Sequence, residues 1–498
     1  MFDMYTELLL GIDAGTTAIK VAAYDTDGRS LARSTVPFEL ETPSPQRVEL
    51  EAELYWANTC TALRDVVRQL GKRSREIRAL AVSSQGETFV ALDERGKALR
   101  KAIVWLDNRA VEEAARIRRA FATEAYYATT GLPTCEASWE SAKILWLREH
   151  EPEVFRRAAS YLLVHDFILY RLTGRRVTEP SVSFSNGFMD FRGATWWREM
   201  VEFVGIRLDQ LPEPMLSGAL VGALTPAAAA ETGLSTATEV YTGALDQICG
   251  AVGAGNIAPG LVTECSGTAL ALVAVSNDVK FDPKRQMPVV RHPNPGRYCL
   301  LPYSQTAAVV LEWFRDNFAQ GEAFDRLVQE AMRVEPGAEG LVCLPHLAGS
   351  TTPIFNPHAR GVFSGFTLRH SRAHFVRAIL ESVGFMLREH IENLRTAGLQ
   401  VGKIRSIGGG ARSDDWLQIK ADICQLPIER VEEDEAATLG AAVIAGVGAG
   451  VLTSFEAAVE SLIRVADRIE PRSELGARYN TAFRAYREAF DRLYDLPR

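Results

Sequence analysis

The sequence is poor in the features on which metal centres, disulfide frameworks and nucleic-acid-binding surfaces depend. Only 7 of its 498 residues are cysteine. Because no two of them form a Cys-x-x-Cys pair, neither a structural zinc site nor a set of disulfides is expected. Acidic residues outnumber basic ones by 63 to 55, for a net charge of −8. A chain without a basic excess is not expected to bind nucleic acid through the phosphate backbone.

The sequence also lacks a long hydrophobic run and a secretory signal. Its longest apolar stretch, residues 436–452, consists largely of Ala and Gly, so we expect a buried helix there rather than a membrane span. The first residues, MFDMYTELLLG, carry two acidic residues and no basic one, unlike a signal peptide. These absences predict a cytoplasmic protein that does not associate with a membrane.

What the chain does contain is strands that alternate with helices. Apolar runs at 8–13, 19–24 and 79–84 predict strands, and residues 88–92 either pair with the last of these or continue it. Helical spacing of apolar residues predicts helices over 51–70, 109–122, 141–149 and 161–173. This order is typical of an α/β fold whose sheets are covered by helices.

A faint internal repeat suggests two similarly built lobes. Residues 8–25 and residues 260–277 each read as an apolar strand, a Gly-Thr turn and a second apolar strand. A Gly-rich span precedes the second copy. We therefore place an N-terminal lobe at 6–253 and a C-terminal lobe at 254–452, with helices at 453–498 packed on the second lobe.

The first Gly-Thr turn has the residues of a phosphate-binding loop. Gly15 lets the backbone approach a ligand closely, and the amides and hydroxyls of Thr16 and Thr17 are suited to donate to phosphate oxygens. Lys20 would add a point positive charge, and Asp13 would hold Mg²⁺, through water. The alternative is an ordinary β-turn beside a surface carboxylate.

Two later segments have related features. Gly267 and Thr268 repeat the Gly-Thr turn without the aspartate, so two such turns could grip a polyphosphate. Residues 408–410 are three glycines between a predicted strand and helix, and Gly409 and Gly410 could border a flat ligand. Asp414 lies near that helix start, where it would border the same ligand or serve as the helix N-cap.

In combination these motifs resemble the FGGY family of carbohydrate kinases, over roughly residues 8–450. Two long segments carry the resemblance most specifically: residues 138–150, which depart from the family pattern at Glu140, and residues 361–381, which depart at Phe366. The resemblance implies two ribonuclease-H-like, actin-like ATPase lobes with a cleft between them. It also implies ATP as the phosphoryl donor, Mg²⁺ as the metal, a small sugar or polyol as the partner, and a homodimer.

The resemblance assigns the catalytic base to Asp246, with Gln247 beside it. Phosphoryl transfer to an alcohol needs the hydroxyl in line with the γ-phosphate and a group that accepts its proton. A carboxylate suffices when the proton leaves late, because its main contribution is orientation. A helix N-cap is the alternative role for Asp246.

Residues 82–88 and 103–109 resemble the family's acceptor-binding segments. Gln85, Gly86 and Glu87 would form the loop that reads the acceptor hydroxyls, and Gly86 would enlarge the pocket because a long side chain is missing there. Trp105 and Asp107 would contact the sugar, although Asp107 could instead brace the pocket. A larger pocket favours a ketopentose over glycerol.

Glu312 falls where family members contact nucleotide, although a solvated helix charge is an equal interpretation. The chain is therefore expected to be an ATP-dependent carbohydrate kinase, with a ketopentose as the first substrate class and glycerol or another polyol as the alternative. Two rivals from other classes are a non-transferring actin-like or Hsp70-like ATPase and a sugar-sensing pseudokinase. The acceptor motifs and the intact Asp13 and Asp246 favour the kinase.

Overall fold

The computed structural model describes residues 7–352, 356 and 358–494, which fold into two compact units. The first unit combines residues 1–257, 289–298 and 435–463, and the second combines 258–288, 299–434 and 464–498. Residues 435–463 thus return to the first unit, whereas the expected division gave 435–452 to the second lobe and packed everything from 453 onward against it. Nothing local in the sequence marks this return.

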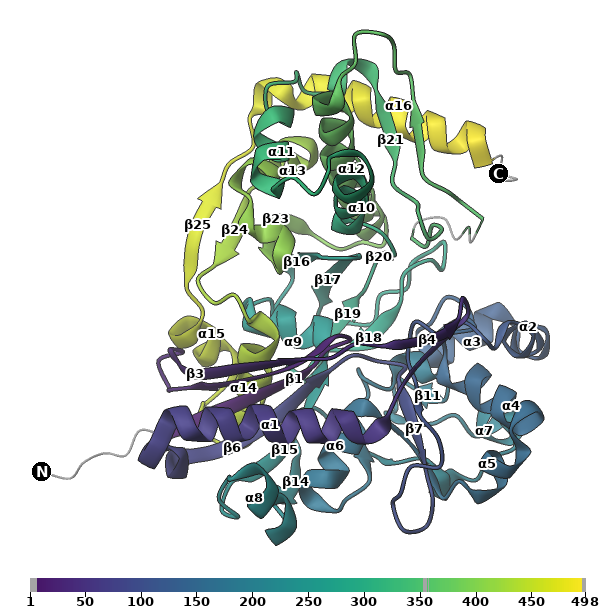
Figure 1. Ribbon diagram of the computed structural model, residues 1–498, viewed down its shortest axis with the longest axis vertical. Helices are drawn as coiled ribbons and strands as arrows, with labels where there is room; N and C mark the ends of the chain where they lie inside the picture. Colours follow the sequence, from purple (N-terminus) through teal and green to yellow (C-terminus); the bar gives the residue numbers. More distant parts are fainter. Residues whose placement is uncertain (1–6, 353–355, 357, 495–498) are drawn as a thin grey trace, which may run out of the picture. The chain divides into compact units, whose positions relative to one another are not determined.

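The first unit is built on a twisted sheet of mixed direction (Figure 1). Its strand order is β14-β15-β6-β1-β2-β3, and β15, β6 and β1 are parallel to one another. A smaller antiparallel sheet has the order β4-β5-β8-β7-β9. The strands of the two sheets are β1 (Leu8–Ala14), β2 (Ala18–Tyr24), β3 (Ser30–Pro37), β4 (Glu41–Ser44), β5 (Arg47–Leu50), β6 (Ile77–Ser84), β7 (Phe89–Leu92), β8 (Ala102–Ile103), β9 (Ser160–Leu163), β14 (Leu220–Ala223) and β15 (Glu239–Leu245).

The position of β7 differs from the two arrangements considered for residues 88–92. This strand neither pairs with β6 nor continues it, because it lies in the smaller sheet between β8 and β9. The chain leaves the large sheet at the loop Gln85–Thr88, where Glu87 adopts a left-handed backbone with φ of 54°. Such a conformation is uncommon for a residue with a side chain and marks a sharp change of direction.

Helices cover both faces of the large sheet. Those of the first unit are α1 (Ala52–Leu70), α2 (Val111–Ala120), α3 (Thr123–Thr130), α4 (Glu140–His150), α5 (Pro152–Arg157), α6 (Val164–Thr173), α7 (Arg198–Val204), α8 (Pro226–Thr232), α9 (Asp246–Gly253), α14 (Ala436–Gly448) and α15 (Phe455–Leu462). Successive side chains of a strand point to opposite faces. Accordingly Leu8, Leu10 and Ile12 of β1 join the core that contains α1, whereas Leu9 and Gly11 face α14.

Helix α14 approaches its neighbours so closely that side chains are excluded from the contact. It packs on β1, β6 and α9, and it is the buried helix expected from the Ala- and Gly-rich stretch. A Cβ on Gly11 would lie 1.9 Å from the Thr438 carbonyl oxygen, and one on Gly440 would lie 1.8 Å from the Cys249 carbonyl oxygen. Glycine is therefore required on both sides of this interface.

The second unit has a sheet in which the main strand order is β19-β17-β16-β23-β24-β25, with β20 beside β17. The strands are β16 (Gly260–Ser266), β17 (Leu270–Ser276), β19 (Tyr298–Leu300), β20 (Tyr303–Ser304), β23 (Val401–Ile407), β24 (Ile428–Val431) and β25 (Val465–Ile469), and a separate hairpin consists of β21 (Val342–Leu344) and β22 (Val362–Ser364). The helices are α10 (Ala308–Phe318), α11 (Phe324–Ala331), α12 (Arg372–Thr396), α13 (Asp414–Cys424) and α16 (Gly476–Tyr494).

The repeat seen in the sequence corresponds to a repeat in structure. In each unit an antiparallel hairpin, β1–β2 or β16–β17, lies beside a parallel strand, β6 or β23. Each hairpin turn carries one of the two Gly-Thr pairs. Within the described residues, no helix combines the length and apolarity needed to span a membrane.

The close packing of α14 gives a first prediction, for Gly440→Ala. The new methyl group would press on the backbone of α9, which cannot move aside without displacing that helix, so we expect a loss of more than about 3 kcal/mol. Gly446→Ala is the matched control, because its methyl group would meet the ends of Leu9 and Leu452, which are side chains. Urea unfolding followed by tryptophan fluorescence should show a much larger shift in midpoint for Gly440→Ala. Equal shifts would contradict this account of the interface.

Candidate active site

Three parallel strands of the first unit end at the same edge of the large sheet, and chemically active residues follow each of them. Asp13 of β1 is level with Ser83 of β6, and Leu245, the last residue of β15, is level with Ser84. The loop that begins at Gln85 follows β6, and Asp246 follows β15. The carboxyl edge of parallel strands is where open α/β sheets bind ligands.

The turn between β1 and β2 is a tight hairpin. The Gly15 amide donates to the Ala18 carbonyl oxygen at 3.1 Å, and a Cβ on Gly15 would lie 3.2 Å from that oxygen. Thr16 is partly exposed and Thr17 is exposed. The turn therefore presents its two hydroxyl-bearing residues outward while glycine allows the chain to close behind them.

Asp13 lies close enough to Asp246 for its negative charge to affect the pKa of Asp246. Burial, together with the negative charges of Asp13 and Glu87, raises the pKa of Asp246 to about 8, although a hydrogen bond from the Gln247 amide, 2.7 Å long, opposes the rise. Burial also raises the pKa of Asp13, although Ser83 Oγ donates to its Oδ1 at 2.7 Å and Lys20 opposes the rise. Asp246 is the first residue of α9, and the preceding residue, Leu245, is the N-cap.

This pair of carboxylates fits a magnesium ion. Mg²⁺ is usually held by one or two protein carboxylates together with phosphate oxygens and water, and a cation would offset the repulsion by Asp13 that contributes to the raised pKa of Asp246. Among the residues described, no cluster of three His, Cys, Asp or Glu side chains could hold a metal without such additional ligands. His370 and His374, near the start of α12, have a four-residue spacing like that of zinc ligands, but they belong to no such cluster.

Lys20, which was expected to contact phosphate, forms an ion pair with a carboxylate of the protein. Its Nζ lies 2.7 Å from the Glu435 carboxylate, with about a third of the lysine side chain exposed. Glu435 immediately precedes α14, so the ion pair ties the second strand of the hairpin to a helix more than 400 residues further along the chain. Its positive charge is thus shared with a carboxylate.

The loop after β6 contains one half-buried carboxylate, Glu87. Burial raises the pKa of Glu87, and the buried ammonium of Lys143 opposes the rise. A Cβ on Gly86 would lie 3.2 Å from Ser185 Oγ and 3.3 Å from Leu245 Cδ1. The space beside Gly86 is therefore already filled, and the expectation that this glycine enlarges a pocket is wrong.

Two residues expected to contact a sugar have their polar atoms occupied by the protein itself. Asp107 is fully buried, and its carboxylate accepts hydrogen bonds from Arg109 Nε at 2.8 Å and from the Val48 amide at 2.7 Å. This arrangement matches the bracing role that was the alternative for Asp107. Gln85 is only 3% exposed, and its amide group bonds to Gly15 and Thr88. Trp105 and Gln247 are partly exposed.

In the second unit, a buried ion pair lies beneath the Gly267–Thr268 turn. Lys420 of α13 is fully buried and donates to Glu264 Oε1 at 2.7 Å and to Ser266 Oγ at 3.0 Å. Glu264 also accepts a hydrogen bond from Ser406 of β23. The network joins β16, β23 and α13, so that the turn at the end of β16 has a fixed position relative to the glycine segment that follows β23.

The glycine segment lies directly against that turn. A Cβ on Gly410 would come within 2.6 Å of Ser266 Cβ and 2.8 Å of its carbonyl oxygen. Gly409 is exposed and begins a short 3₁₀ helix, Gly409–Arg412. Thr268 is exposed at the tip of the β16–β17 hairpin. The two segments thus form one continuous surface in this unit.

Asp414 and Glu312 are surface residues of the second unit. The N-cap of α13 is Ser413, whose Oγ accepts from the Trp416 amide at 3.3 Å, so the expected alternative of an Asp414 cap is wrong. Asp414 instead pairs with Arg430 at 2.9 Å, with 77% of its side chain exposed. Glu312 is exposed on α10 and lies 3.8 Å from Arg315.

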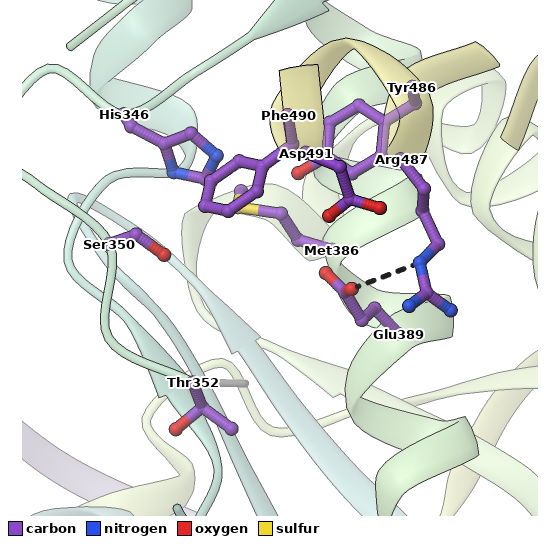
Figure 2. Close-up of a pocket in the computed structure, with 9 residues that line it drawn as sticks. All are labelled: His346, Ser350, Thr352, Met386, Glu389, Tyr486, Arg487, Phe490 and Asp491. Carbon is purple, nitrogen blue, oxygen red and sulfur yellow. Dashed lines mark ion pairs between the residues drawn. The ribbon is translucent and has the colours of Figure 1, made fainter. Parts of the chain in front are cut away.

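A small pocket between α12 and α16 lies in the same unit but contains none of the expected site residues (Figure 2). Its cavity of about 20 Å³ holds about one water molecule. Burial raises the pKa of Glu389 to about 7, while Arg487, 3.7 Å away, opposes the rise, and Glu392 and Asp491 add to it. The charge of Lys284 also opposes the rise.

Comparisons with known proteins match the full length of this architecture. The N-terminal domain of the FGGY family of carbohydrate kinases matches residues 8–253, and its C-terminal domain matches residues 266–449. The chain is 32% identical to the xylulose kinase of Bacillus subtilis (strain 168) over 98% of this chain and 97% of that one. It is 28% identical to the gluconokinase of the same organism, over 96% and 94%.

A solved structure shows the same fold. The xylulose kinase from Rhodospirillum rubrum has a TM-score of 0.90 at 30% identity, covering 98% of this chain and 99% of that one. The chain belongs to the FGGY family of carbohydrate kinases, which have two actin-like ATPase lobes. The expected family, fold class and enzyme class are thereby confirmed: the protein transfers phosphate from ATP to an alcohol group of a carbohydrate.

The pocket of Figure 2 gives a prediction about stability and pH. The folded-state pKa of Glu389 is raised from 4.5 to about 7. Between these two pH values the folded protein therefore keeps a proton on Glu389 that the unfolded chain has lost. Its contribution to stability is therefore present below about pH 4.5 and is lost as pH rises towards 7. Glutamine at this position has the shape of the protonated glutamate at every pH. As the pH rises from 4.5 to 8, we therefore expect the free energy of unfolding of Glu389→Gln to increase by about 3 kcal/mol relative to that of the wild type.

Urea unfolding at a series of pH values measures this difference. Glu488→Gln on α16 is the matched control, because 65% of that side chain is exposed and it should leave the pH dependence close to that of the wild type. A Glu389→Gln protein whose stability follows the wild type at every pH would show that the carboxylate is not held protonated.

Proposed function

We propose that this kinase phosphorylates a ketopentose such as xylulose, with Asp246 as the catalytic base. The observation that carries the proposal is the placement of Asp246, Asp13 and Glu87 at the carboxyl edge of three parallel strands. The whole-length similarity to xylulose kinases supports the substrate class. A carboxylate whose pKa is raised to about 8 is a better proton acceptor than an ordinary aspartate.

In the proposed reaction, Asp246 orients a hydroxyl of the sugar towards the γ-phosphorus of ATP. The hydroxyl oxygen forms a bond to that phosphorus, the bond from phosphorus to the β–γ bridging oxygen breaks, and ADP leaves with the electron pair. The hydroxyl proton passes to Asp246 late in this step and is later released to water. Orientation of the hydroxyl contributes more than basicity, because the transition state is loose.

Asp13 would hold Mg²⁺ through water, and Asp246 would lie close to the same ion. Bound there, the metal supplies positive charge that neutralises the charge developing on the transferred phosphoryl group. Ser83, which donates to Asp13, favours the ionised form of the carboxylate, against the effect of burial, and orients it. Asp13 is thus the residue that we assign to the metal, in preference to any histidine.

In each unit, the Gly-Thr turn is assigned to phosphates of ATP. Gly15, Thr16 and Thr17 are assigned to the first unit's turn, and Gly267 with Thr268 to that of the second. Lys20 would reach the phosphates only by loosening its ion pair with Glu435. Gly409, Gly410, Asp414 and Glu312 are assigned to the nucleoside, for which the exposed Gly409 and the surface position of Asp414 provide accessible contacts.

For the acceptor, Glu87, Gln247 and Trp105 are the residues with accessible groups. Glu87 would accept hydrogen bonds from sugar hydroxyls and Gln247 would exchange them. Gln85, Gly86 and Asp107 would shape the site, because their polar atoms or their surroundings are already occupied. The 28% identity to a gluconokinase makes a sugar acid the second candidate acceptor.

A panel of acceptors tests the substrate. The purified protein with Mg·ATP should release ADP fastest with D-xylulose or another ketopentose, and at least tenfold more slowly with gluconate or glycerol at the same concentration. A coupled assay for ADP measures the rates, and the sample without acceptor sets the basal hydrolysis. A faster rate with gluconate would show that the acceptor is a sugar acid and not a ketopentose. No stimulation by any acceptor would contradict the proposed transfer.

The substitution Asp246→Asn tests the assigned base. It keeps the size of the side chain but removes the proton acceptor, so we expect kcat to fall by about a thousandfold, while the affinity for ADP, measured by calorimetry, changes by less than about threefold. Asp209→Asn is the control, since this exposed aspartate of the same unit pairs with Arg207 at the surface. Turnover of Asp246→Asn within tenfold of the wild type would refute the role.

A further inference from the structure

A closed ring of hydrogen bonds joins two loops of the first unit. One is the turn Gly15–Thr17, called the phosphate loop below, and the other is the loop Gln85–Thr88, called the acceptor loop. Gln85 Nε2 donates to the Gly15 carbonyl oxygen at 3.1 Å, and Thr88 Oγ1 donates to Gln85 Oε1 at 3.0 Å. The Trp105 amide donates to Thr88 Oγ1 at 2.9 Å, and the indole Nε1 of Trp105 donates to Thr16 Oγ1 at 2.9 Å. The ring thus begins at Gly15 and returns to Thr16.

The hydrogen bond from Trp105 to Thr16 restricts where the hydrogen of the Thr16 hydroxyl group can point. A threonine hydroxyl has one hydrogen to donate and two lone pairs with which to accept, whereas an indole nitrogen can only donate. Because the hydroxyl of Thr16 accepts from Trp105, its own hydrogen must point elsewhere. Thr16 lies in the exposed turn, so the hydrogen is available to a phosphate oxygen.

Gln85 holds the other side of the ring in one orientation. Its nitrogen faces the Gly15 carbonyl oxygen and its oxygen faces the Thr88 hydroxyl group, so a reversed amide would place two acceptor oxygens, Gln85 Oε1 and the Gly15 carbonyl, together. Thr88 must therefore donate to Gln85, which leaves its oxygen to accept from the Trp105 amide. Each bond of the ring sets the direction of the next.

Trp105 is placed to respond to both loops. Its ring is partly exposed and packs against the edge of the core that contains β1, β6 and α1. Its packing holds the indole in place, and its Nε1 reaches the phosphate loop. A sugar that contacts the exposed part of the ring would restrict the ring further and with it the Thr16 hydroxyl.

We propose that Trp105, supported by Gln85 and Thr88, is a positioning residue that makes the Thr16 hydroxyl a fixed donor to a nucleotide phosphate and transmits acceptor binding to that hydroxyl. The inference rests on the proposed function for its assignment of the two loops. It assigns to Gln85 the task of joining the loops in place of reading the sugar. In this way phosphate binding becomes tighter when the acceptor is present, which favours transfer over hydrolysis.

A double-mutant cycle tests the bond without any sugar. Trp105→Phe removes the indole N–H, and Thr16→Val removes the hydroxyl. In the wild-type background, Trp105→Phe should weaken binding of a non-hydrolysable ATP analogue with Mg²⁺ by about three- to tenfold, measured by calorimetry. In the Thr16→Val background it should change binding by less than twofold, because the group that it orients is gone.

Two further variants and the addition of a sugar complete the experiment. Thr16→Ser keeps the hydroxyl and should bind within threefold of the wild type while remaining sensitive to Trp105→Phe. Trp196→Phe is the matched control, since its indole N–H donates to the Pro212 carbonyl oxygen at 3.0 Å, away from the phosphate loop, and it should leave binding unchanged. Adding D-xylulose should tighten analogue binding in the wild type and in Thr16→Ser, but not in Trp105→Phe.

The outcomes separate this inference from the proposed function. Equal weakening by Trp105→Phe in the wild-type and Thr16→Val backgrounds, or no weakening in either, overturns the positioning role. Failure of the wild type to phosphorylate any ketose overturns the proposed substrate, and the sugar-free cycle still decides whether Trp105 orients Thr16. An unchanged effect of xylulose in Trp105→Phe overturns the transmission of acceptor binding through this residue.

Discussion

The proximity of two carboxylates at one edge of the large sheet is the constraint on which the proposed chemistry depends. Asp13 is the residue before the last of β1, and Asp246 follows β15. Burial raises the pKa of both carboxyls, and the negative charge of Asp13 also raises that of Asp246. Without a cation, ionising both groups is costly, because each carboxylate is desolvated by burial and the charge of Asp13 repels that of Asp246. The same cost becomes useful when a magnesium nucleotide arrives, since the ion offsets the repulsion and the carboxylates are already in place.

The rest of the fold holds this edge rigid. In the first unit, glycines bring α14 against β1 and α9 with backbone in contact with backbone, and the Lys20–Glu435 pair anchors the hairpin to the start of the same helix. In the second unit, the buried Lys420–Glu264 pair joins three elements beneath the Gly-Thr turn. A buried ion pair adds little net stability; its contribution here is to define where that turn lies.

The sequence predicted the local features and missed most of the long-range ones. The Gly-Thr turns, the strands at 8–13 and 79–84 and the buried helix in the stretch 436–452 follow from short patterns, and the family motifs supplied the fold class. The partner of Lys20 could not be predicted, because Glu435 lies 415 residues away. The filled space beside Gly86, the position of β7 and the assignment of residues 435–463 to the first unit also depend on packing. Ser413 as the cap of α13 was within reach, since serine is as good a cap as aspartate.

Proton release on nucleotide binding tests the central claim most directly. If Asp246 has a pKa of about 8 in the free protein, it is largely protonated at pH 7, and a magnesium ion bound beside it should displace that proton. Calorimetric titration with Mg·ADP in buffers of different ionisation enthalpy should show release of close to one proton per site at pH 7. The release should be absent in Asp246→Asn. Binding without proton release in the wild type would contradict the account of the two carboxylates.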